Sequence, residues 1–243
     1  MCFSLDQTAA EIEIHERNGK YLEVRAVRHC VELLESRNVV VLSGREGSGK
    51  SRNGLEILRQ IKGKNRDFEI FKLIGLNYVS DIVKDNVTSI VLFDDAFGQF
   101  YNDKHILDHL YSYIDIHKLK LIFTMRNSVK HACQQLTHIL FHDLFDIDLN
   151  SETFQLTKVE KENMLSNYCD MHNIMISVGR EDDTDQSVSN RHQRDDNEAY
   201  QSVPGQAAVI LERETMNEII ETDPFLGFRN VVDYLLKIER ALI

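Results

Sequence analysis

The sequence predicts an α/β protein in which a parallel sheet is flanked by helices and followed by a small helical region. Three observations support this prediction. Short apolar runs alternate with longer segments of helical spacing between about residues 21 and 150. The clearest of these runs are continuously apolar and rich in β-branched residues, as expected of strands buried on both faces. A glycine-rich stretch joins the first run to the helix that follows it.

The elements follow in order along the chain. Apolar residues recur at helical spacing over residues 21–36, which predicts the first helix. A strand over 38–42, the glycine-rich stretch 44–49 and a helix over 49–60 come next. Continued alternation then predicts strands at 68–74, 89–93, 119–124 and 145–149, with helices at 103–117 and 128–137.

The pattern changes after the last predicted strand. Thr157 and Glu160 have the spacing of a capping box, which predicts a helix to about residue 171. Residues 180–204 are rich in acidic side chains and nearly free of large apolar ones, so we expect a flexible insert there. Helical spacing returns in two further segments, residues 207–222 and 225–243, which Pro224 separates.

Composition restricts the functional class. The chain has 243 residues, of which 42% are hydrophobic and 28% charged, the profile of a globular protein with a sizeable core. No apolar run approaches the roughly 20 residues of a membrane span, and the four cysteines have no paired spacing. The net charge of -11 opposes broad contact with nucleic acid phosphates. We therefore expect a cytoplasmic protein with neither membrane nor nucleic acid as partner.

The strongest motif is residues 44–51, which match G-x-x-x-x-G-K-[ST] in full. Such glycines let backbone N–H groups point at phosphate oxygens, and the following helix offers its positive end. Lys50 would reach the β- and γ-phosphates, and Ser51 would coordinate Mg2+. A random chain of this size matches by chance in roughly one case in a hundred. The predicted phosphate-binding residues are Gly44, Arg45, Glu46, Gly47, Ser48, Gly49, Lys50 and Ser51.

Two acidic residues close the apolar run at 89–93. Asp94 would hold Mg2+ through water, opposite the phosphate loop. Asp95 is placed to polarise an attacking water, although its charge could instead only tune the metal. The alternative for both is an ordinary solvated turn after a strand, and the loop upstream favours the metal site.

A second polar pair, Thr124 and Arg126, ends the strand predicted at 119–124, so a parallel sheet would bring it to the same edge. Both are candidate sensors of the γ-phosphate, although Arg126 could instead be a surface ion-pair partner. His105 and His109 share a helix face but have no third metal ligand, so we interpret them as an ordinary helix face. An N-K-x-D sequence is absent, which leaves ATP or ADP as the expected nucleotide by elimination.

Three blocks of sequence together resemble the STAND branch of P-loop NTPases, specifically the third group of novel STAND NTPases. They are residues 40–51, 91–98 and 121–126, and the aspartate pair followed by an aromatic residue and glycine is the most diagnostic. The resemblance covers about residues 22–175 and, more weakly, 207–230. It departs at the acidic segment 180–204 and at Arg229, where the family would have proline.

The resemblance implies a P-loop NTPase fold and a regulated ATPase that acts as a switch or scaffold, in innate-immunity or cell-death-type pathways, with protein partners or self-association. Two alternatives stay open: a P-loop kinase for a small molecule, and a non-hydrolysing interaction module. We divide the chain into an N-terminal segment and helix (1–36), a P-loop NTPase domain (37–150), a helical extension (151–175), an acidic flexible insert (176–206) and a C-terminal helical segment (207–243).

Overall fold

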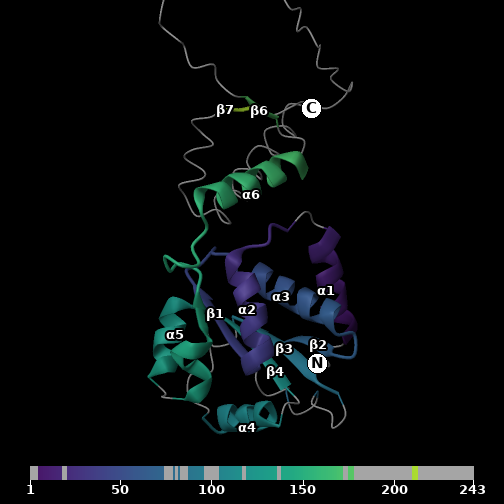
Figure 1. The fold of residues 1–243 in the computed structure, drawn as a ribbon, viewed down its shortest axis with the longest axis vertical. Helices are drawn as coiled ribbons and strands as arrows, with labels where there is room; N and C mark the ends of the chain where they lie inside the picture. Colours follow the sequence, from purple (N-terminus) through teal and green to yellow (C-terminus); the bar gives the residue numbers. More distant parts are fainter. Residues whose placement is uncertain are drawn as a thin grey trace, which may run out of the picture.

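The structure is a computed structural model (Figure 1). It describes residues 5–17, 21–73, 79, 82, 87–95, 104–116, 119–135, 138–171, 175–177 and 210–212. Within this part of the chain, no helix has both the length and the apolar character that crossing a membrane requires.

A five-stranded sheet in the order β2-β3-β4-β1-β5 forms the centre of the fold, and every pairing within it is parallel. The predicted fold class is therefore confirmed. The strands are β1 (Val39–Gly44), β2 (Glu69–Leu73), β3 (Ser89–Asp94), β4 (Leu119–Arg126) and β5 (Asp146–Asp148). The helices between or beside them are α2 (Arg25–Arg37), α3 (Lys50–Lys64), α4 (Lys104–Asp115) and α5 (Asn127–Gln134).

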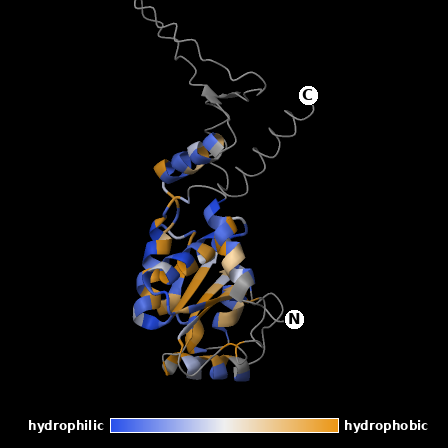
Figure 2. Ribbon diagram, turned by 90° about the vertical axis from the view of Figure 1, so that its right-hand side faces the viewer, coloured by the Kyte–Doolittle hydropathy of each residue, from blue (hydrophilic) through white to orange (hydrophobic). Residues whose placement is uncertain are grey.

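Two hydrophobic cores cover the two faces of the sheet. Alternate strand residues such as Val40 and Leu92 pack with α2 and α3 on one face, whereas Val41 and Phe93 pack with α4 and α5 on the other. Figure 2 shows the apolar strands between helices whose outer surfaces are hydrophilic. Because both faces of the sheet are buried, the central strands β1, β3 and β4 have nearly continuous apolar runs, which is why they could be recognised in the sequence.

The register brings the carboxyl ends of three strands together. Gly44 at the end of β1 pairs with Arg126 of β4, and Asp94 at the end of β3 pairs with Thr124. The phosphate-type loop, the acidic pair and the polar end of β4 therefore share one edge of the sheet, as predicted.

One helix was not predicted. Helix α1 (Leu5–Arg17) packs against α3 and β2 on the same face of the sheet as α2. Among the side chains of α1 whose burial is described, the buried stripe is Thr8, Ile12 and His15, which has helical spacing and is mostly polar. Hydrophobic periodicity therefore could not find it, because polar contacts replace most of the apolar ones.

The segment after the sheet agrees with the sequence at its start and differs later. Helix α6 (Lys158–Met171) begins as predicted: Thr157 Oγ1 accepts from Glu160 N at 3.2 Å, and Glu160 Oε2 accepts from Thr157 N at 2.7 Å. Two short 3-10 helices, Ile139–Phe141 and Asp143–Phe145, lie before this segment, between α5 and β5.

A second, two-stranded parallel sheet joins β6 (Met175–Ser177) to β7 (Ile210–Glu212). The helix predicted over 207–222 is therefore wrong at 210–212, where strand pairing with a distant segment overrides the local helical spacing. Residues 176 and 177 of the predicted flexible insert also belong to this sheet. The rest of the insert and the helix predicted at 225–243 lie outside the described residues.

Candidate functional site

The loop between β1 and α3 needs its glycines. Gly47 and Gly49 have φ angles of 79° and 82°, in the left-handed region that side chains disfavour. A Cβ on Gly44 would lie 2.6 Å from Ser48 Oγ, which donates to the carbonyl of Arg45 at 2.8 Å. The loop therefore has the tight curvature that its sequence predicts.

The side chain of Lys50 folds back into this loop. Its Nζ donates to the carbonyls of Arg45 at 2.5 Å and Gly44 at 3.3 Å. Burial lowers the pKa of Lys50 below its ordinary value, although the carboxylate of Asp95 opposes the shift. The loop thus holds a partly buried cation together with the N-terminus of α3, an arrangement suited to phosphate.

Asp94 is the centre of a hydrogen-bond network at the start of α3. Its Oδ1 accepts from Ser51 Oγ at 2.8 Å and from Thr124 Oγ1 at 2.7 Å. A hydroxyl and a carboxylate beside a phosphate loop are the oxygen ligands that Mg2+ prefers, so these residues fit the predicted ion. Thr124 is buried and its contacts are with the two aspartates, so its predicted contact with a γ-phosphate stays a prediction.

Asp95 has a strained backbone and an exposed side chain. Its φ of 53° lies in the left-handed region, and its N–H donates to Thr124 O at 3.1 Å and to Thr124 Oγ1 at 3.0 Å. These two bonds hold the turn in place, and the side chain, 54% exposed, projects from it. Strain of this kind often accompanies functional positions.

Arg126 links the acidic pair to the phosphate loop. Its guanidinium lies 3.7 Å from the carboxylate of Asp95 and 3.2 Å from that of Glu46. Arg126 is about half exposed, so the contacts themselves contribute little stability. They do place a positive charge at the mouth of the loop.

The structure therefore brings the candidate site residues from the sequence together at the carboxyl ends of β1, β3 and β4. His105 and His109 are exposed on α4, and no group of three or more metal-ligating side chains occurs within the described ranges.

Sequence reasoning missed two further residues of the site. Asn150, just after β5, accepts from the N–H of Arg45 at 2.6 Å and so supports the loop. Lys72, on β2, lies 3.2 Å from Asp94 Oδ2 and 2.9 Å from Glu11 of α1. Burial opposes charge on Lys72, but hydrogen bonds to both carboxylates raise its pKa above the ordinary value. No motif marks either residue, because each acts through a neighbour that is distant in sequence.

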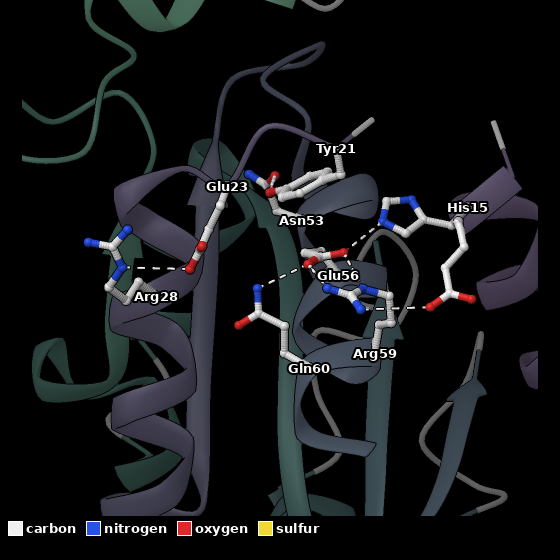
Figure 3. Close-up of polar contacts among 9 residues, drawn as sticks. His15, Tyr21, Glu23, Arg28, Asn53, Glu56, Arg59 and Gln60 are labelled. Carbon is white, nitrogen blue, oxygen red and sulfur yellow. Dashed lines mark hydrogen bonds and ion pairs between the residues drawn. The ribbon is translucent and has the colours of Figure 1, made fainter. Parts of the chain in front are cut away.

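A second polar cluster lies on the outer side of α3 (Figure 3). The buried carboxylate of Glu56 accepts from Arg59 at 2.7 and 2.9 Å and from Gln60 at 3.0 Å, and it lies 3.1 Å from His15 Nε2 of α1. Burial works against its charge, yet these hydrogen bonds lower the pKa of Glu56 to about 2. With Tyr21, which donates to Asn53 at 2.6 Å, these residues border a cleft of about 650 Å³.

Comparison with known proteins gives one family. The sequence profile described as Novel STAND NTPase 3 matches residues 21–171, more than half of the chain. No curated protein matches it significantly.

The chain is also similar to several solved structures. A closed-state reconstruction of Hsp104 with ATPγS and FITC casein is 14% identical, with a TM-score of 0.48, covering 68% of this chain and 35% of that one. The Thermotoga maritima RuvB Holliday junction branch migration motor is 17% identical, with a TM-score of 0.43, covering 62% and 52%. Cdc6p from Pyrobaculum aerophilum is 15% identical, with a TM-score of 0.40, covering 58% and 47%. This chain thus spans about a third of the length of the Hsp104 chain and about half of the length of each of the other two.

Proposed function

The chain belongs to the Novel STAND NTPase 3 family, and from this premise we propose that it is an ATP-controlled switch that binds ATP with Mg2+ and hydrolyses it slowly. The observation that carries the proposal is the network at Asp94, where Ser51 and Thr124 both donate to one carboxylate oxygen beside the phosphate loop. A loop that was only a structural turn would not need this convergence of three strand ends.

The residues divide the work as follows. Lys50 and the loop N–H groups bind the β- and γ-phosphates. Ser51 and Asp94 hold Mg2+, which when bound would neutralise phosphate charge. Asp95, exposed beside this pair, accepts the proton of the attacking water, and Arg126 neutralises negative charge on the γ-phosphate. Slow hydrolysis suits a switch, since the bound nucleotide then sets the duration of one state.

The loop is also connected to the segment that leads to α6. Asn150 bonds the N–H of Arg45, and Arg25 at the start of α2 donates to the carbonyl of Gln155 at 3.2 Å. Nucleotide that reshapes the loop would alter the contact with Asn150 and so the path of the segment that leads to α6. Differential contact with the γ-phosphate supplies the bias between states that a switch requires.

The family resemblance further supports a role in innate-immunity or cell-death-type signalling, in the cytoplasm, with protein partners or self-association. In this proposal the nucleotide state controls which surface the C-terminal region offers to such a partner.

The test is titration of the chain with ATP, GTP and ADP in the presence of Mg2+, with Lys50→Ala as the control. ATP binding that weakens on the order of a hundredfold in Lys50→Ala is the expected result, because a charge-assisted contact to phosphate is lost. Phosphate release to water supports the switch. A phosphorylated acceptor would indicate a kinase instead, and turnover equal to that of Lys50→Ala would indicate a static nucleotide-bound module. Absence of binding by the folded wild type would refute the proposal.

A further inference from the structure

Lys72 connects helix α1 to the carboxylate at the metal position. It lies on β2, which is at the edge of the sheet. Its backbone N–H donates to Thr8 Oγ1 of α1 at 3.0 Å, and its Nζ lies 2.9 Å from Glu11 Oε2 of α1 and 3.2 Å from Asp94 Oδ2. One half-buried ammonium therefore bridges a carboxylate of α1 and the carboxylate that faces Ser51.

Helix α1 lies outside the part of the chain that the family profile matches, residues 21–171. It is nevertheless seated on the nucleotide-binding fold through polar contacts, which include the bond of His15 to Glu56 and a 3.7 Å ion pair between Glu16 and Arg59. Among the described side chains of α1, Ile12 is the buried apolar one, and a helix seated through polar contacts of this kind is suited to docking that responds to charge.

The two oxygens of Asp94 have different partners. Oδ1 accepts from the hydroxyls of Ser51 and Thr124, whereas Oδ2 faces the ammonium of Lys72. A divalent cation held by Ser51 and Asp94 would be repelled by this ammonium, since both are cations drawn to one carboxylate. Glu11 is the second carboxylate, and it can still pair with Lys72 when Asp94 coordinates a metal.

We propose that Lys72 is a positioning residue that couples the docking of α1 to metal binding at Asp94. Glu11 draws the ammonium away from Asp94, so docked α1 raises the affinity for Mg2+ and nucleotide. Thermodynamic linkage requires the reverse as well: bound Mg2+ and nucleotide strengthen the docking of α1. This inference rests on the proposed function and adds a regulatory element to its site.

The first test is a double-mutant cycle of Glu11 and Lys72, in which ATP binding is measured as a function of Mg2+ concentration. Lys72→Met removes the competing cation, so the Mg2+ concentration that gives half-maximal ATP binding should fall. For partly exposed charges the expected fall is about three- to tenfold. Glu11→Gln leaves Lys72 on Asp94 alone, so this concentration should rise by about threefold. In the Lys72→Met background, Glu11→Gln should have no effect, because its target is absent.

Matched controls separate this coupling from general damage. Glu13→Gln removes an equal charge from α1 whose partner is Arg17, so the Mg2+ dependence should stay as in the wild type. Lys72→Arg keeps the charge and should also stay close to the wild type. Circular dichroism and urea denaturation of each variant identify structural damage. If Lys72→Met does not fold, the Mg2+ dependence of Glu11→Gln compared with that of Glu13→Gln still tests the coupling, and equal values would overturn it.

The second test measures hydrogen exchange in residues 5–17. Addition of Mg2+ and ATP should slow exchange in the wild type by about threefold and leave Glu11→Gln unchanged. Two results would overturn the coupling. One is ATP binding with the same Mg2+ dependence in the wild type and Lys72→Met, and the other is hydrogen exchange in residues 5–17 of the wild type that Mg2+ and ATP do not change.

A wild type that binds no nucleotide would refute the proposed function separately. Binding of Mn2+ alone, followed by electron paramagnetic resonance, then tests the same variants. Tighter Mn2+ binding by Lys72→Met would still support the coupling, and equal affinities would overturn it.

Discussion

Two carboxylates beside helix α3 have opposite environments. Glu56, in the middle of the helix, is buried, and protein groups bond both of its oxygens. Asp94, at the end of β3 and beside the first turn of α3, accepts from Ser51 and Thr124 at one oxygen and pairs with a shared lysine at the other. Both carry charge in a confined space, yet only Asp94 lies at the edge where the phosphate loop and three strand ends meet.

The difference teaches how to distinguish a structural charge from a functional one. Four fixed hydrogen bonds and ion pairs stabilise the ionised form of Glu56, which leaves no bonding capacity for a ligand. The partners of Asp94 are two hydroxyls and an ammonium that it shares with Glu11, which a cation can join or replace. Glu56 should therefore determine stability and Asp94 with its neighbours should determine activity. Four predictions test this comparison.

The largest effect is expected at Asp95, on the functional side. Asp95→Asn keeps the shape and tolerates the left-handed backbone, so only the proton acceptor is lost. ATP hydrolysis should slow on the order of a hundred- to a thousandfold, with ATP affinity within about threefold of the wild type. Phosphate release and nucleotide titration measure the two quantities. Equal hydrolysis rates in the two proteins would remove Asp95 from the role of general base.

On the structural side, Glu56→Ala should lower the free energy of unfolding by about 3 kcal/mol, because His15 and Gln60 lose their buried partner. Urea denaturation measures this, and ATP affinity should be unchanged at a temperature where the variant is folded. Glu35→Ala is the matched control. Its exposed pair with Lys64 should contribute less than about 1 kcal/mol. Similar losses for both variants would contradict the distinction.

Acid should weaken the structural cluster in a defined window. The pKa of Glu56 is depressed from 4.5 to about 2, so its contribution is fully present above the unfolded pKa and is lost as the pH falls from about 4.5 towards 2. With the partial exposure of Arg59 taken into account, the loss is on the order of 2 kcal/mol. Urea midpoints of the wild type and Glu56→Gln should converge as the pH approaches 2. A constant difference would show that the charge of Glu56 is not responsible.

The smallest effect is expected at Asn150. Asn150→Ala removes the acceptor for the N–H of Arg45, so ATP affinity should weaken by about fivefold, which corresponds to about 1 kcal/mol. Asn65→Ala is the control, because it removes a comparable bond, from Asp67 N to Asn65 Oδ1 at 3.0 Å, away from the loop. It should leave affinity unchanged. Equal effects of both variants would mean that Asn150 acts only through stability.

The fold of the central part could be predicted because its signals are local. Runs such as residues 89–93 are apolar on both faces, and the loop at 44–51 needs glycine at the positions where φ is positive. Helix α1 and strand β7 could not be predicted in this way. The buried stripe of α1 is mostly polar, and β7 depends on pairing with β6, more than thirty residues away along the chain.

The sequence by itself determined the succession of strands and helices along the central part of the chain, and it determined the phosphate loop. It also identified four polar groups at strand ends: Asp94, Asp95, Thr124 and Arg126. Only the tertiary structure decided that Lys72 faces Asp94, that Glu11 shares this lysine, and that Asn150 supports the loop. The physical reason is the range of the interactions. Periodicity and glycine requirements act within one element, whereas a lysine finds its carboxylates only after a strand edge and a distant helix have come together.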